Sequence, residues 1–224
     1  MKRILLFLSV FFVFGNAYSQ EVNFSRWQLT LDGGWSYRTA EVIDAPPEVE
    51  SYIEGLRSGY NISGKGVYYF KKFIGAGLNV SVSNYSNEAN NLNTKEGIMR
   101  NVSDNITIGY IAPCVGFRVT VKEKHSFPFD ASVGVLWYKD KGYANTNLAE
   151  INGATLGVGI GAGYDYAITK NVAVGVKMSL LSGTLNSYTL RLNGGYKQTV
   201  NLEGTEQREN LSQFNLLAGV RFNF

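Results

Sequence analysis

The chain has 224 residues, with 21 Lys and Arg against 18 Asp and Glu, and a formal net charge of +3. Lys2 and Arg3 supply two of these charges at the extreme N-terminus, so the rest of the chain is nearly neutral, which excludes a strongly basic nucleic-acid-binding protein. One cysteine, Cys114, excludes an internal disulfide framework, and 25 glycines with four prolines suit one all-β domain.

Residues 1–19 have the features of a secretory signal peptide. Lys2 and Arg3 precede an apolar run from Ile4 to Phe14, and small residues come before a cut at Gln20. The run is too short to span about 30 Å of hydrocarbon, and no later stretch reaches the roughly 18 apolar residues of a helical span. We therefore predict a cleaved signal peptide over 1–19 and one domain over 20–224.

Alternation of apolar and non-apolar residues predicts eight strands in the remaining chain. Their expected ranges are Ser25–Arg38, Ile62–Phe70, Ile74–Asn84, Ile106–Val121, Phe127–Lys139, Ala154–Ile168, Val172–Ser182 and Gln213–Phe224. In the fourth strand the apolar parity changes at Pro113. This change predicts a bulge at Ala112–Cys114, which turns Arg118 to the polar side.

The connections between these strands alternate between short and long. The first long connection is predicted to hold a short helix around Glu48–Leu56, while 85–104 and 140–152 are predicted to be polar loops. The last one is predicted to contain a hairpin of Ser187–Leu192 with Tyr196–Val200. Short turns at one end and long loops at the other are typical of transmembrane barrels.

Alternation alone also fits a soluble, lipocalin-like barrel, which keeps its apolar side chains inside. Here the non-apolar set consists mainly of Gly, Ser and Asn, which suit the narrow lumen of an eight-stranded barrel. Aromatic residues lie near strand ends, as interfacial girdles require; they are Trp27, Trp35, Trp137, Tyr164 and Tyr166. The predicted fold is all-β, an eight-stranded antiparallel up-and-down transmembrane β-barrel.

The final strand carries a resemblance to a known class. Phe214, Leu216, Phe222 and Phe224 share one parity, and the sequence ends on Phe224. This pattern resembles the C-terminal signal strand of bacterial outer-membrane barrels, which the barrel-insertion machinery reads. The chain is similar over nearly its whole mature length to the small eight-stranded barrels, OmpX-like or like the transmembrane domain of OmpA-like proteins. The resemblance implies a monomer integral to a Gram-negative outer membrane, surrounded by its lipid, with loops facing outside.

Seven charged residues share the inward parity of the predicted strands. They are Asp32, Lys65, Arg118, Asp130, Asp165, Lys177 and Arg221. Such charges could form a gated ion path or a plug of salt bridges, and the plug is favoured because eight strands leave a lumen that side chains fill. The glycines at 157, 159, 161 and 163 could clear space for a ligand, but we favour packing against Tyr69, Leu136 and Tyr138.

Catalytic chemistry has little support in the sequence. The lipid A palmitoyltransferases and deacylases are similar in strand number and use a histidine at the outward end, whereas His125 is predicted to be a solvated residue of a periplasmic turn. We expect no catalytic residue, cofactor or metal site. The predicted role is structural or adhesive, through long loops that contact an extracellular protein or host surface. The alternatives are a small passive channel and, less favoured, an outer-leaflet lipid A-modifying enzyme.

Overall fold

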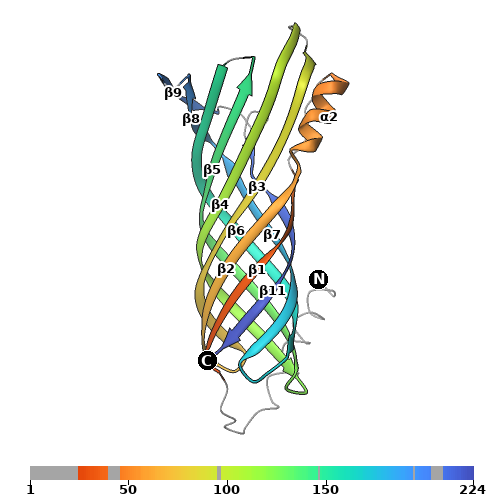
Figure 1. The fold of residues 1–224 in the computed structure, drawn as a ribbon. Helices are drawn as coiled ribbons and strands as arrows, with labels where there is room; N and C mark the ends of the chain where they lie inside the picture. The colour runs from red at the N-terminus through yellow and green to blue at the C-terminus, as the bar shows by residue number, and fades with distance from the viewer. Residues whose placement is uncertain (1–24, 40–45, 95–96, 146, 194, 203–208) are drawn as a thin grey trace, which may run out of the picture.

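The computed structural model describes residues 25–39, 46–94, 97–145, 147–193, 195–202 and 209–224, so the predicted signal peptide lies outside the described residues. Eight long strands form a closed barrel (Figure 1). They are β1 (Trp27–Arg38), β2 (Ser58–Lys71), β3 (Ile74–Thr94), β4 (Gly97–Val121), β5 (His125–Ala144), β6 (Asn147–Ala167), β7 (Val172–Leu185) and β11 (Gln213–Asn223). Neighbours pair antiparallel, and β1 pairs with β11 to close the ring, which confirms the predicted up-and-down topology.

Three tight turns join β2 to β3, β4 to β5 and β6 to β7 at the end of the barrel where the chain terminates (Figure 1). We call this end periplasmic and the opposite end extracellular, because short turns face the periplasm in outer-membrane barrels. No helix in the described part of the chain combines the length and apolar character needed to cross a membrane.

The strands extend further at the extracellular end than the sequence indicates. The predicted polar loops at 85–104 and 140–152 are wrong: β3 continues to Thr94, β4 begins at Gly97, β5 continues to Ala144 and β6 begins at Asn147. Polar residues on both faces hide the period-2 signal there, while pairing with neighbouring strands satisfies the backbone. The result is an ordered sheet above the barrel wall.

The last long connection contains the predicted hairpin, formed by β8 (Ser187–Leu192) and β9 (Tyr196–Asn201). Strand β8 continues the pairing of β7 with β6, but seven residues from Gly183 to Thr189 face six from Asn152 to Gly157, so a bulge separates the two strands. The short strand β10 (Glu209–Asn210) pairs with the end of β7. Strand β9 is thus left at the edge of the sheet.

The predicted helix is present as α2 (Pro47–Gly55), with a proline at its start where the missing N–H costs nothing. It lies along the upper part of β3, beyond the point where β2 pairs with that strand (Figure 1). Glu48 accepts hydrogen bonds from the backbone and side-chain nitrogens of Asn93 at 3.1 and 2.9 Å, and Asn87 donates to the Tyr52 carbonyl at 2.7 Å. Helix α2 therefore covers the sheet edge that β2 leaves open.

The predicted bulge at Ala112–Cys114 is wrong. Strand β4 pairs with β3 in one unbroken register through Pro113, and its register with β5 is the same on both sides of this residue. The change of apolar parity has another cause: Ile106, Ile108 and Tyr110 are buried inside the barrel, whereas the apolar residues from Val115 to Val121 face outward. The interior itself changes from polar to apolar along the strand.

Candidate functional site

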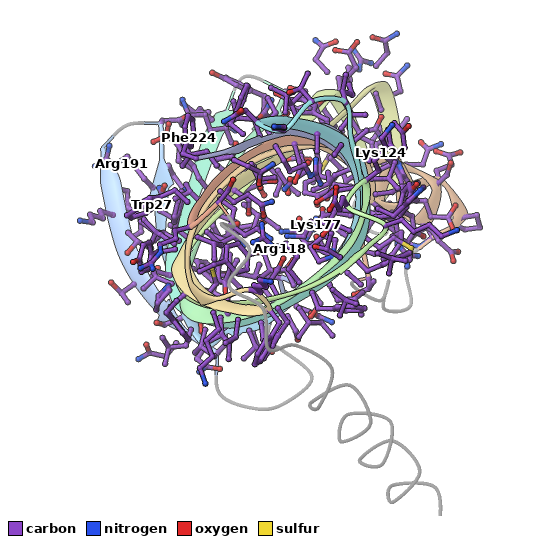
Figure 2. The ribbon with its side chains drawn as sticks, turned by 90° about the horizontal axis from the view of Figure 1, so that it is seen from below. Trp27, Arg118, Lys124, Lys177, Arg191 and Phe224 are labelled. Carbon is purple, nitrogen blue, oxygen red and sulfur yellow. The ribbon has the colours of Figure 1, made fainter. Side chains whose placement is uncertain are left out.

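The outer wall of the barrel is an apolar band. On β4 it runs from Ile111 to Val121, and on β5 from Phe127 to Trp137. Trp27, Tyr164 and Tyr166 lie near its periplasmic rim, where Trp27 packs on Tyr68 at 5.1 Å between ring centroids. Trp35 and Trp137 lie nearer the extracellular rim. On β11, the outward residues are Phe214, Leu216 and Phe222, with Phe224 just beyond the strand (Figure 2).

The lumen holds the seven predicted charges, and Figure 2 shows Arg118 and Lys177 inside the ring. Arg221 bridges two carboxylates: its Nη1 lies 2.5 Å from Asp32 Oδ1 and its Nε lies 2.6 Å from Asp165 Oδ1. The arginine side chain is only 2% exposed, as is that of Asp32. Because the guanidinium fork presents several donors in fixed geometry, one arginine can hold both carboxylates.

A second ion cluster joins Asp130 to two lysines. Lys65 Nζ lies 2.5 Å and Lys177 Nζ lies 3.0 Å from Asp130 Oδ1, and all three side chains are buried. Arg118 lies apart from these two clusters. Its guanidinium is over the Tyr69 ring, 4.0 Å from the centroid, and it donates to the Ser25 carbonyl at 3.4 Å. The sequence predicts which charges face inward, but not which of them pair.

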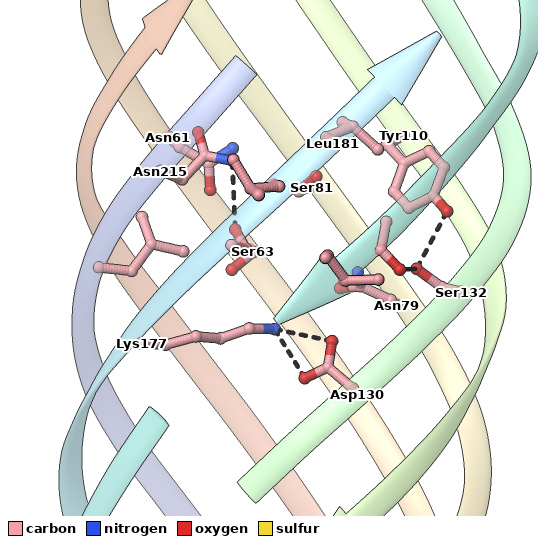
Figure 3. Close-up of a pocket in the computed structure, with 15 residues that line it drawn as sticks. Asn61, Ser63, Asn79, Ser81, Tyr110, Asp130, Ser132, Lys177, Leu181 and Asn215 are labelled. Carbon is pink, nitrogen blue, oxygen red and sulfur yellow. Dashed lines mark hydrogen bonds and ion pairs between the residues drawn. The ribbon is translucent and has the colours of Figure 1, made fainter. Parts of the chain in front are cut away.

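Above the ions, a layer of uncharged polar groups fills the lumen. Ser36 donates to Asn215 Oδ1 at 2.5 Å and contacts the Tyr85 hydroxyl, and Asn61 donates to Ser83 Oγ at 2.7 Å. Figure 3 shows a third contact, in which Tyr110 donates to Ser132 Oγ at 3.0 Å. Sequence patterns do not single out these residues, because Ser and Asn are also common in the long connections. Their inward parity was the available signal.

The extracellular half of the lumen contains an apolar core. Leu136, Leu181, Leu185 and Leu211 pack there with the inward aromatic and aliphatic residues of β4, and Tyr52 and Leu56 join them from helix α2 and its C-terminus. Two cavities of about 20 Å³ and 10 Å³ remain among the ion and polar layers. Each has room for about one water molecule. The described residues thus leave these cavities far smaller than an aqueous pore.

The glycine row of β6 makes room for this filling. A Cβ at Gly157 would collide with Leu136, and one at Gly161 would lie 2.5 Å from Lys177 Cε and 3.0 Å from Asp130 Oδ2. The expectation of packing is right for Leu136. For Gly161, the space is taken by an ion pair that the sequence does not reveal.

His125 and Cys114 differ in how far their side chains are buried. The prediction that His125 is a solvated turn residue is wrong, because it begins β5, is half-buried, and its Nδ1 lies 2.8 Å from the Tyr164 hydroxyl. Cys114 is buried beside Val67 and Tyr69, as expected for a small apolar residue, though without the bulge. Among the described residues, no group of three His, Cys, Asp or Glu side chains is arranged to hold a metal.

Beyond the apolar band, two acidic residues lie close together at the mouth. The Tyr52 hydroxyl donates to Asp104 Oδ2 at 2.7 Å, and the Tyr138 hydroxyl donates to Asp140 Oδ2 at 3.3 Å. Burial raises the pKa of Asp104, and burial together with the charge of Asp104 raises the pKa of Asp140 to about 6.

Comparisons with known proteins agree with this architecture. No curated protein matches the chain. The solved structure of Neisserial surface protein A is similar with a TM-score of 0.50 and 13% identity, covering 91% of this chain and 100% of that one. A major outer membrane protein from Thermus thermophilus is similar with a TM-score of 0.59 and 10% identity, covering 89% of this chain and 99% of that one. At these identities the likeness shows the fold.

A family model described as "Outer membrane protein beta-barrel domain" matches residues 17–180, which is most of the chain. The closed barrel, its apolar outer band and its filled interior, which is polar in the periplasmic half, agree with that family. The chain therefore belongs to the outer membrane protein β-barrel domain family and is an integral protein of the Gram-negative outer membrane.

Proposed function

We propose that this protein is a surface-interaction protein, which contacts an extracellular protein or host surface through the part of the barrel above the membrane. We call this part the extracellular crown; it consists of α2, β8, β9 and the ends of β3 to β6 beyond the apolar band. The observation that carries the proposal is that these strands continue as ordered sheet above a lumen filled with side chains. A rigid, projecting sheet offers a binding surface.

The edge of β9 is the part of the crown best suited to bind another chain. It is a terminal strand of the sheet, so within the described residues one row of its backbone N–H and C=O groups has no partner strand. The corresponding edge of β3 is covered by helix α2. An extended segment of a partner can add to β9 as a further strand, with the backbone supplying affinity.

Removal of the β8–β9 hairpin tests this function. We expect a chain that lacks residues 187–200, joined by a short Gly-Ser linker, to lose adhesion to cells or matrix proteins while keeping the heat-modifiable migration of a folded barrel. The matched control lacks the β3–β4 tip, residues 92–99, and leaves β9 in place. Unchanged adhesion after loss of the hairpin would contradict the proposal.

The channel alternative makes an opposite prediction. A lumen whose cavities hold about one water molecule each conducts little or no current, so purified protein in planar bilayers should show no stable single-channel events. Large, steady currents would favour the channel.

A lipid A-modifying enzyme is the third alternative. The histidine available for acid–base chemistry, His125, lies at the periplasmic end, opposite the outer leaflet. We expect lipid A to have the same mass in cells with and without the protein.

A further inference from the structure

A row of charged side chains crosses the outward face of the crown. Lys141 on β5, Glu150 on β6, Arg191 on β8 and Lys197 on β9 are direct cross-strand partners. Neighbouring strands lie about 4.8 Å apart, so the four side chains form one continuous row. The single carboxylate is shared, with Glu150 3.5 Å from Lys141 and 4.0 Å from Arg191.

Positive charge on this face is in excess. Lys139 precedes Lys141 on the same side of β5, so the described residues of this face comprise four cations against one carboxylate. Lys139 and Lys197 have no ion pair within the described part of the chain, and the side chains of Lys141 and Arg191 are each 48% exposed. We call Lys139, Lys141, Arg191 and Lys197 the cationic face. Figure 2 shows Arg191 on the outside of the ring.

The excess is local and is not a property of the whole crown. The opposite side, formed by α2 and β3, carries Glu48, Glu50, Glu54 and Glu88, all exposed. The described charges are therefore partly separated: carboxylates predominate on the α2 side, which also carries Arg57, and cations predominate on the other. A face that served only to keep the sheet solvated would not need this separation.

The cationic face begins where the apolar band ends. Trp137 ends the apolar run on the outward side of β5, Lys139 and Lys141 are the next two outward positions, and the exposed Tyr143 follows them. Aromatic belts lie at the level of lipid headgroups. Lys139 is thus placed at the headgroup level of the outer leaflet, with Lys141 and the arginine further from the membrane.

We propose that the cationic face binds the phosphate groups of the glycolipid in the outer leaflet. The arginine fork offers two donors to phosphate oxygens, and each lysine adds a compact positive charge. Asn152 and Thr189, which pair across from Lys139 in the adjacent row, supply polar side chains on the same face. A phosphorylated headgroup can therefore be held by charge and hydrogen bonds while its acyl chains lie against the apolar band.

The test uses the purified, refolded full barrel in non-ionic detergent micelles, with bis-phosphorylated lipid A as the probe and bound lipid counted by native mass spectrometry. The variant combines Lys139→Gln, Lys141→Gln and Arg191→Gln. The matched control combines Lys122→Gln, Lys124→Gln and Lys170→Gln, which removes three exposed cations from the periplasmic end. Lys197 on β9 is left unchanged, so that the edge used for partner adhesion is not altered.

We expect the crown variant to lose affinity for lipid A by at least about tenfold, since each cation near an anionic lipid surface contributes roughly fivefold. The periplasmic control should bind lipid A as the unmodified protein does, and dephosphorylated lipid A should bind weakly to all three. Equal affinity of the crown variant and the unmodified protein would overturn the proposal, as would an equal loss in the periplasmic control. Displacement of lipid A by millimolar inorganic phosphate would also overturn it, because the site would then select free phosphate. Adhesion through β9 is measured in a separate experiment, so the adhesion proposal and the lipid-binding proposal can each be refuted without the other.

Discussion

Arg221 shows how a single residue holds the lumen of this barrel together. It lies between Asp32 and Asp165 with its side chain almost fully buried, so removal of its charge leaves two carboxylates without their cation. We expect Arg221→Met to lower the free energy of unfolding by about 3–5 kcal/mol, because an uncompensated buried charge is costly. Urea unfolding in lipid vesicles, followed by tryptophan fluorescence, measures this change.

Two further variants separate the charge effect from packing. Adding Asp32→Asn and Asp165→Asn to Arg221→Met removes the unpaired charges and should restore most of the lost stability, since a neutral lumen of similar volume is often as stable as an ion cluster. Arg57→Gln, a cation of the crown outside the lumen, should change stability by less than about 1 kcal/mol. If the triple variant is no more stable than Arg221→Met, the charge explanation is wrong.

At the level of elements, the contact between helix α2 and strand β4, beside Asp140 of β5, should depend on pH. Asp140 has a pKa raised from 3.8 to about 6, by burial first and then by the charge of Asp104, and it also faces Tyr138, Arg38 and Glu209. A carboxyl with a raised folded pKa stabilises the folded state below its ordinary pKa, and this contribution is lost as the pH rises through about 6.

We therefore expect amides of the crown to exchange hydrogen more readily near pH 8 than near pH 5, after correction for intrinsic rates, by no more than about 3 kcal/mol in protection. Asp140→Asn should remove most of this difference, whereas strands within the apolar band should show none of it. Equal pH dependence in Asp140→Asn would assign the effect to another group.

At the level of elements, the sequence predicts some features of the fold and not others. The sequence predicts a short helix where α2 lies and, from a turn signal, the β8–β9 hairpin, while period-2 alternation predicts the eight membrane strands. It fails for the upper ends of β3 to β6, whose polar residues carry no contrast between faces. It also misassigns the parity change at Pro113, because Ile106 and Ile108 pack inside the lumen, whereas the apolar residues of this strand are expected to face lipid. Ion pairs such as Lys65 with Asp130 join residues far apart in sequence, so no local pattern predicts them.

On the scale of the whole molecule, the apolar band makes stability depend on depth in the membrane. Ile160 faces outward near the middle of β6 and is 53% exposed. We expect Ile160→Arg to lower the free energy of unfolding by about 2–4 kcal/mol, because the charge must enter hydrocarbon. Ser86→Arg, outward on β3 beyond the band, should cost less than about 1 kcal/mol. Unfolding of both variants in lipid vesicles provides the comparison, and similar costs would argue against the position of the band.

The pairing of β1 with β11 has a consequence for the order of assembly. The Gln28 amide donates to Asn223 Oδ1 at 3.0 Å across a separation of 195 residues, and the whole β1–β11 ladder joins segments at similar distances along the chain. Contacts of such high sequence separation form late, since the entropy of closing a long loop must be overcome first. Seven of the eight ladders of the barrel join long strands that are successive along the chain, so a curved, open sheet can form before β1 pairs with β11. Until this pairing forms, β1 and β11 are open edge strands of that intermediate and can pair with other chains. These two strands therefore have the greatest need of chaperones on the way to the membrane.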